Sequence, residues 1–180
     1  ITHMIRSILL HPDPRLKKVC VPVADVSSDV GRLAEDMLQT MYDAPGVGLA
    51  APQIGVQKRL FVMDCVKEVG ALAKPIVLIN PFISWMSDVM NTYEEGCLSL
   101  PDQFADVERP ATVRVQFTGL DGRAQEEEFE GLWATCAQHE IDHLDGRLFI
   151  DHLGPLKRQM ITRKMQKYKR DLARGTYDQV

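Results

Sequence analysis

The feature that most constrains the fold is the segment His139-Glu140-Ile141-Asp142-His143. Its two histidines are four residues apart, so on an α-helix both rings point to the same side and can bind one ion. Glu140 lies beside them, where its carboxylate can take a proton from water on the metal. The alternative is a pair of hydrogen-bonded core histidines, but two histidines and a glutamate on a buried face are costly without partners. The segment therefore predicts a metal-binding helix that faces the core.

Three segments have apolar residues at helical spacing, and they predict helices over residues 27–42, 131–144 and 155–174. In the last helix, a broken apolar face is expected, made of Leu156, Met160, Met165, Tyr168 and Leu172. The glycine-rich segment 46–55 is not expected to form a regular helix or a central strand.

Short β-prone segments predict strands over residues 60–63, 76–79, 112–117 and 125–129, with a longer mixed segment at 83–93. Asp121-Gly122 is expected to form the turn of a hairpin. The expected fold class is α+β: mostly antiparallel β-sheets packed around a central metal-binding helix, with a C-terminal helix.

Composition indicates one folded domain. The chain has 180 residues, of which 45% are hydrophobic and 26% charged, so residues 1–180 are interpreted as a single catalytic domain. Residues 1–3, ahead of Met4, are interpreted as a cloning remnant. No apolar run of membrane-spanning length occurs, and four widely spaced cysteines favour a reducing compartment. The net charge of −4 does not favour nucleic acid as a partner of the whole domain.

A catalytic metal site of this kind needs a third protein ligand and an open position. Phe149 stands where the extended protease pattern has its third histidine, and no glutamate follows Glu140. The third ligand is therefore expected upstream, or from an aspartate. The best upstream candidate is Cys97, because Gly96 gives the chain flexibility there and a thiolate binds divalent metals well.

Three segments together resemble the signature motifs of peptide deformylases, in the order of that family. They are the segments Gly46-Val47-Gly48-Leu49-Ala50-Ala51-Pro52-Gln53, Glu95-Gly96-Cys97-Leu98-Ser99 and His139-Glu140-Ile141-Asp142-His143. The similarity extends over nearly the whole chain from Met4. It implies a metal-dependent hydrolase that removes the N-formyl group from the N-terminal formylmethionine of new polypeptides and releases formate.

The resemblance also implies roles for individual residues. Cys97, His139 and His143 would bind one divalent metal ion, with water in the fourth position. Glu140 would act as the general base. The donors to the developing oxyanion would be the side-chain amide of Gln53 and the backbone N–H of Leu98. The family often uses iron(II), whereas two nitrogens and one sulfur also suit zinc, nickel or cobalt.

Further expectations concern the substrate. By similarity to the family, an apolar pocket for the methionine side chain would be lined by Val47, Leu132, Thr135 and Cys136. Gly48 and Gly96 would allow the substrate backbone to approach. An ion pair between Asp142 and Arg109 would orient the helix. Phe104 departs from the family pattern, because many relatives carry an arginine there.

The predicted C-terminal helix is strongly basic. Eight lysines and arginines lie between residues 157 and 174, opposed by Asp171 alone. One interpretation is a solvated helix face; the other, which the resemblance suggests, is contact with ribosomal RNA near the exit of nascent chains. The bacterial cytoplasm is the expected location, with an organelle or a phage as alternative sources.

Two rival functions stay open on the sequence. One is a metallopeptidase built on the same two histidines and glutamate, which the missing downstream ligand disfavours. The other is a non-catalytic protein with a closed zinc site and Cys136 as fourth ligand. That reading leaves Glu140 and Gln53 without a task.

Overall fold

The structure, a computed structural model, describes residues 4–175. The interpretation of residues 1–3 as a cloning remnant lies outside the described residues. Within residues 4–175, none of the helices is long and apolar enough to cross a membrane.

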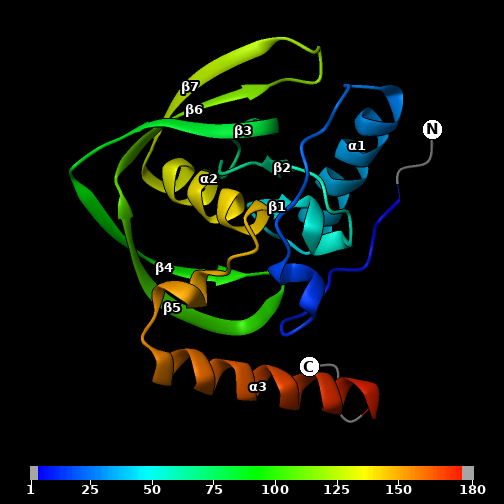
Figure 1. The fold of residues 1–180 in the computed structure, drawn as a ribbon, viewed down its shortest axis with the longest axis vertical. Helices are drawn as coiled ribbons and strands as arrows, with labels where there is room; N and C mark the ends of the chain where they lie inside the picture. Colours follow the sequence, from blue (N-terminus) through cyan, green and yellow to red (C-terminus); the bar gives the residue numbers. More distant parts are fainter. Residues whose placement is uncertain (1–3, 176–180) are drawn as a thin grey trace.

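Two antiparallel sheets form the framework of the molecule (Figure 1). The larger sheet has the order β1-β2-β3-β6-β7, with strands Gly48–Ala50, Leu60–Met63, Ile76–Met86, Thr112–Thr118 and Ala124–Glu130. The smaller sheet pairs β4 (Met90–Cys97) with β5 (Leu100–Pro110). The expected α+β class with mostly antiparallel sheets is confirmed.

Helix α2 (Gly131–Leu144) lies between the two sheets at the centre of the molecule (Figure 1). Its bounds are those that the sequence predicted. Ten of its fourteen residues are buried, including both histidines and Glu140. Its apolar residues join a core cluster with strands β2, β3 and β6. The metal-binding motif is therefore held inside the protein rather than on its surface.

Helix α1 (Ser28–Asp43) packs on β1 and β2 and confirms the first predicted helix. Its buried stripe includes Val30, Leu33, Met37 and Met41. The glycine-rich segment forms the short edge strand β1 and the 3₁₀ helix η2 (Ala51–Ile54). As expected, it contains neither a regular α-helix nor a central strand.

Helix α3 (Pro155–Ala173) lies on the outside of the molecule, against β5 and the 3₁₀ helix η3 (Phe149–His152) (Figure 1). The apolar face predicted for it is partly wrong. Its buried residues are Ile161 and Met165, whereas Leu156, Met160 and Leu172 are exposed. A helix that touches the core along one narrow line buries only that stripe, so most of its apolar residues stay in solvent.

The strand predictions need two corrections. Segment 83–93 is divided between β3 and β4, with the chain reversing at residues 87–89. Strand β5 was not predicted, because it begins with Leu100-Pro101-Asp102 and alternates polar residues with few buried ones. In this strand, Arg109 contacts Asp142 of α2, and Phe104 lines the cavity described below.

Candidate active site

Helix α2 and the end of strand β4 bring the three predicted ligands together. His139 and His143 come from α2, and Cys97 is the last residue of β4. One ligand atom from each lies within 4.8 Å of the others, and Cys97 Sγ is 3.4 Å from His143 Nε2. In the described part of the chain, this is the one such group of histidine, cysteine and acidic ligands. Two imidazole nitrogens and a thiolate suit a divalent transition metal.

A carboxylate behind the ligands fixes the first histidine. His139 Nδ1 donates to Glu95 Oε1 over 2.9 Å, which leaves Nε2 free to bind a metal. Burial by itself would raise the pKa of Glu95, but the hydrogen bonds from His139 and Arg109 outweigh it and lower that pKa. No role was predicted for Glu95. The available signal was its place two residues before Cys97, which puts both side chains on one face of the strand.

The expected ion pair between Arg109 and Asp142 is confirmed at 2.9 Å. Arg109 also makes two hydrogen bonds to Glu95, of 2.7 and 3.0 Å, and its side chain is 5% exposed. Asp142 in turn contacts His152 Nε2 at 2.8 Å. Arg109 on β5 therefore links the carboxylate behind His139 to the outer side of α2.

Glu140 is buried beside the ligands. Its Oε1 is 3.8 Å from His139 Nε2, and its Oε2 has no hydrogen-bond partner among residues 4–175. Burial raises the pKa of Glu140 to about 7, and nearby Glu95 adds to this shift. A carboxyl group with a pKa near neutrality can both accept and release a proton. Burial likewise lowers the pKa of His143, which favours the neutral ring that a metal requires.

Gln53, on η2, is oriented by two hydrogen bonds. Its Oε1 accepts from the backbone N–H of Ala50 at 2.9 Å, and its Nε2 donates to Ser99 Oγ at 3.0 Å. The same Nε2 lies 3.5 Å from Cys97 Sγ. The amide therefore presents its N–H groups toward the ligand cysteine. Ser99 belongs to the second motif, but this orienting contact was not predicted.

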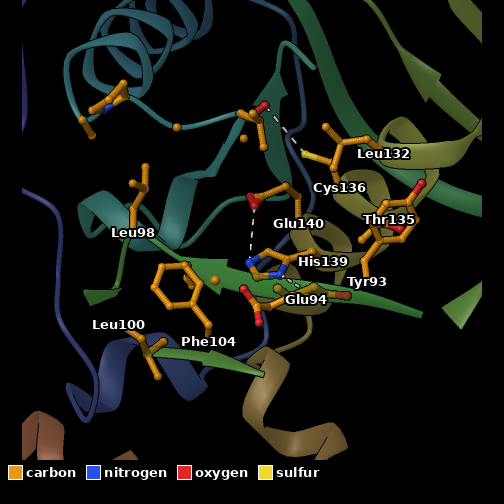
Figure 2. Close-up of a pocket in the computed structure, with 18 of the residues that line it drawn as sticks. Tyr93, Glu94, Leu98, Leu100, Phe104, Leu132, Thr135, Cys136, His139 and Glu140 are labelled. Atoms are coloured by element: carbon orange, nitrogen blue, oxygen red, sulfur yellow. Dashed lines mark hydrogen bonds and ion pairs between the residues drawn. The ribbon is translucent and has the colours of Figure 1, made fainter. Parts of the chain in front are cut away.

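A cavity of about 550 Å³ opens beside these groups. The six predicted substrate-binding residues all line it: Val47, Gly48, Gly96, Leu132, Thr135 and Cys136. Figure 2 shows Leu132, Thr135 and Cys136 on one side of Glu140 and His139. A Cβ at position 48 would lie 2.7 Å from Cys136 Sγ and 3.1 Å from the Glu140 side chain. Any larger residue at position 48 would therefore displace the side chains of Cys136 and Glu140.

Cys136 does not join the ligand group. Its Sγ contacts the carbonyl oxygen of Val47 at 3.7 Å, in the wall of the cavity (Figure 2). The cluster of ligand atoms contains Cys97, His139 and His143 without it. The hypothesis of a closed zinc site with Cys136 as fourth ligand is therefore wrong.

Known proteins of one family are similar to this chain. The family model for polypeptide deformylase matches residues 5–159. A peptide deformylase from Rhodopseudomonas palustris (strain BisB5) is 54% identical over 164 residues, which are 91% of this chain and 94% of the relative.

Solved structures of the same family are similar to this chain as well. The crystal structure of a peptide deformylase from Legionella pneumophila has a TM-score of 0.86 and 48% identity, and the match covers 94% of this chain and 98% of that one. For the peptide deformylase from Ehrlichia chaffeensis the TM-score is 0.88 and the identity 36%, with 92% and 97% covered. The chain belongs to the polypeptide deformylase family.

Proposed function

We propose that Cys97, His139 and His143 hold the metal ion with which this peptide deformylase removes the formyl group from formyl-methionyl peptides. The observation that carries the assignment is the convergence of these three ligands on one point, with Cys97, His139 and the buried Glu140 lining one cavity. Membership in the deformylase family argues against the metallopeptidase alternative.

The residues divide the chemistry among them. A divalent ion lowers the pKa of a water molecule and polarises the formyl carbonyl group when bound. Glu140 removes the proton from the attacking water and then delivers a proton to the leaving amine nitrogen. The Gln53 amide and the Leu98 backbone N–H donate to the formyl oxygen as negative charge develops on it. The carbon–nitrogen bond breaks, and formate and a free amino terminus are released.

The decisive experiment compares three substrates. Formyl-Met-Ala should be hydrolysed, whereas acetyl-Met-Ala and a longer unmodified peptide should not. Hydrolysis of an internal bond in the unmodified peptide would indicate a peptidase instead.

The apolar lining supports methionine as the first side chain. A long, unbranched, flexible side chain fits beside Val47, Leu132 and Cys136. Formyl-Met peptides should therefore exceed formyl-Gly peptides in kcat/KM by about ten- to a hundredfold, the discrimination that an apolar pocket achieves. Equal rates would contradict the pocket assignment.

For the metal itself, we propose iron(II) as the native ion, while zinc, nickel and cobalt also suit a site of two nitrogens and one sulfur. Metal analysis after anaerobic purification identifies it. Cys97→Ala should lose metal and activity together. Cys20→Ala is the matched control, because Cys20 is a buried free cysteine outside the ligand group. Full metal occupancy in Cys97→Ala would show that another residue supplies the third ligand.

We further propose that helix α3 contacts ribosomal RNA, which would raise the concentration of nascent substrate near the active site. Its basic residues are Lys157, Arg158, Arg163, Lys164, Lys167, Lys169, Arg170 and Arg174, and all except the partly buried Lys169 are exposed. The rest of the chain is acidic enough to give a net charge of −4. Phosphate contacts made by such a helix weaken steeply with salt.

The test reverses the charge of the helix instead of removing it, because deletion would uncover the core residues beneath Ile161 and Met165. Replacing Arg163, Lys164 and Lys167 by glutamate should reduce ribosome co-sedimentation at low salt. The matched control carries the same three charge reversals at the exposed Lys17, Lys18 and Lys58. Equal ribosome binding by both variants, or ribosome binding that does not change with salt concentration, would contradict the proposal.

We also propose that residues 1–180 act as one catalytic domain in a bacterial-type cytoplasm. The single framework around α2 and the four free cysteines support this proposal. Fractionation of the source cells tests the location, and limited proteolysis that releases a separately folded fragment would contradict the single domain.

A further inference from the structure

Two buried cysteines meet beside the methionine pocket, the part of the cavity formed by Val47, Leu132 and Cys136. Cys136 lies on α2, and Cys65 follows the end of β2. Each of these cysteines is 6% exposed, and both belong to the same core cluster. Cys97, the candidate metal ligand, packs against a different cluster. The pair is therefore separate from the ligand group.

The backbone carbonyl group of Val47 holds both cysteines near one point. Its oxygen accepts the backbone N–H of Asp64, the residue before Cys65, at 2.8 Å. The same oxygen contacts Cys136 Sγ at 3.7 Å (Figure 2). The thiols of Cys65 and Cys136 share a hydrogen bond. Two thiols in contact can form a disulfide with little movement of the backbone.

The active site gives access to this pair. Cys136 lines the catalytic cavity of about 550 Å³, whereas Cys65 lies behind the lining. Hydrogen peroxide is little larger than water and can enter such a cavity. The hydrogen bond with Cys65, together with burial, raises the pKa of Cys136. The Cys136 thiol therefore stays protonated at neutral pH, and the pair is oxidised slowly unless peroxide accumulates.

We propose that Cys65 and Cys136 are a modification site, at which peroxides form a disulfide that reshapes the methionine pocket. The effect on catalysis rests on the deformylase function and on the pocket proposed above. In a reducing compartment, a disulfide of this kind is transient and reports oxidative conditions.

The reaction balances with peroxide as the oxidant. One sulfur attacks a peroxide oxygen, the oxygen–oxygen bond breaks, and a sulfenic acid and a water molecule form. The second sulfur attacks the sulfenic sulfur, the disulfide bond forms, and a second water molecule leaves. The two thiols thereby lose two electrons and two protons to the peroxide. An external dithiol reverses the change by thiol–disulfide exchange.

The disulfide changes the wall that the methionine side chain contacts. In the reduced protein, Cys136 Sγ lies against Gly48 and the carbonyl oxygen of Val47. A bond to Cys65 draws this sulfur away from the Val47 oxygen and toward the end of β2. A change of about one methylene group in an apolar pocket alters kcat/KM by about tenfold or more.

The experiment treats nickel-loaded enzyme with hydrogen peroxide, because iron(II) itself reacts with peroxide. Mass spectrometry of unreduced peptides should find Cys65 linked to Cys136, with the loss of two hydrogen atoms from the intact chain. The kcat/KM for formyl-Met-Ala should fall by about tenfold, and a dithiol reductant should restore it. Unchanged nickel content shows that Cys97 has not been oxidised.

Three variants locate the effect. Cys65→Ala removes one thiol outside the cavity lining, so peroxide should neither link Cys136 nor cause a loss that the reductant reverses. Cys65→Ser makes the same test with a side chain of nearly the same size, should the alanine variant fail to fold. Cys20→Ala is the matched control, because Cys20 is another buried free cysteine of the same cluster. Its linked peptide and its loss of activity should equal those of the wild-type enzyme.

The outcomes separate this inference from the function on which it rests. If the untreated enzyme does not hydrolyse formyl-Met-Ala, the proposed function fails, and peptide mapping still tests the disulfide. Absence of the linked peptide overturns the modification site. A linked peptide with unchanged kcat/KM overturns the effect on the pocket. A reversible loss that persists in the Cys65 variants assigns the effect to another cysteine and also overturns the proposal.

Discussion

Helices α2 and α3 are held in the molecule in opposite ways. Ten of the fourteen residues of α2 are buried, whereas the nineteen-residue α3 buries Ile161 and Met165. Helix α2 is packed between two sheets, and α3 lies on the outside (Figure 1). The helix that carries the candidate metal ligands is enclosed, and the helix that carries the basic charge is exposed.

The contrast explains why the polar residues of the two helices behave differently. A polar group inside the protein is stable only with partners, and His139 and Asp142 find theirs in Glu95 and Arg109 from the small sheet. Basic residues on α3 need no partner because water solvates them. Substitutions in the enclosed region should therefore cost far more than similar substitutions on α3.

The largest effect is expected for Glu140→Gln. An amide cannot act as the base, so turnover should fall by about 10²–10⁴-fold. Metal content should stay unchanged because the three ligands remain. Assays with formyl-Met-Ala and metal analysis of the same sample check this. Glu68→Gln, in an exposed loop, should be neutral. Normal turnover in a metal-replete Glu140→Gln variant would contradict the role of Glu140 as the general base.

The next effect concerns the ion pairs behind the active site. Arg109→Leu leaves Glu95 buried without its cation, so the free energy of unfolding should fall by about 3–5 kcal/mol. In Arg32→Leu the lost partner is Asp29, and both side chains are more than two-thirds exposed. That loss should stay below about 1 kcal/mol. Urea denaturation of both variants measures the difference, and equal losses would break the contrast between enclosed and exposed charge.

Within α3 itself, depth should decide the cost. Met165 is fully buried, so Met165→Ala should cost about 2–5 kcal/mol through the cavity that it leaves. Met160 is 50% exposed, and Met160→Ala should change stability by less than about 0.5 kcal/mol. Thermal and chemical denaturation compare the pair. A large loss of stability in Met160→Ala would mean that the face of α3 that carries Met160 is buried against another surface.

The smallest effect is a pH dependence at the base of α3. His11 is buried and its Nε2 contacts Thr162 Oγ1 at 2.9 Å. Burial lowers the pKa of His11 from 6.5 to about 4, and Lys17 adds to this shift while Asp151 opposes it. Between pH 6.5 and about 4, the unfolded chain therefore binds a proton at His11 that the folded protein does not bind. Stability from this source is complete above pH 6.5 and decreases as the pH falls toward 4.

His11→Gln removes the titrating imidazole while keeping a polar side chain opposite Thr162. The Tm of the variant should consequently fall less steeply between pH 6.5 and 4 than that of the wild-type protein. Parallel slopes in the two proteins would show that His11 does not titrate as described.

Parts of the fold that depend on local pattern were predictable. The bounds of α2 follow from its apolar periodicity, and the strands predicted at 60–63 and 112–117 follow from β-prone runs. Strand β5 was missed because its polar alternation and its prolines carry little local signal. The exposure of Leu156 was missed for a related reason: periodicity marks an apolar face but not whether anything packs against it.

The candidate site divides in the same way. Residue chemistry and motif spacing by themselves identified four residues of the candidate site: the two helical histidines, the adjacent glutamate and the candidate cysteine ligand. The histidines could be paired because residues at i and i+4 point the same way on any helix. Only the tertiary structure decided that Glu95 supports His139, that Ser99 orients Gln53, and that Phe104 lies over Gly96. The first two contacts join residues more than forty positions apart, and the third depends on the β4–β5 register. All three depend on how β4, β5 and η2 pack around α2, which no local pattern encodes.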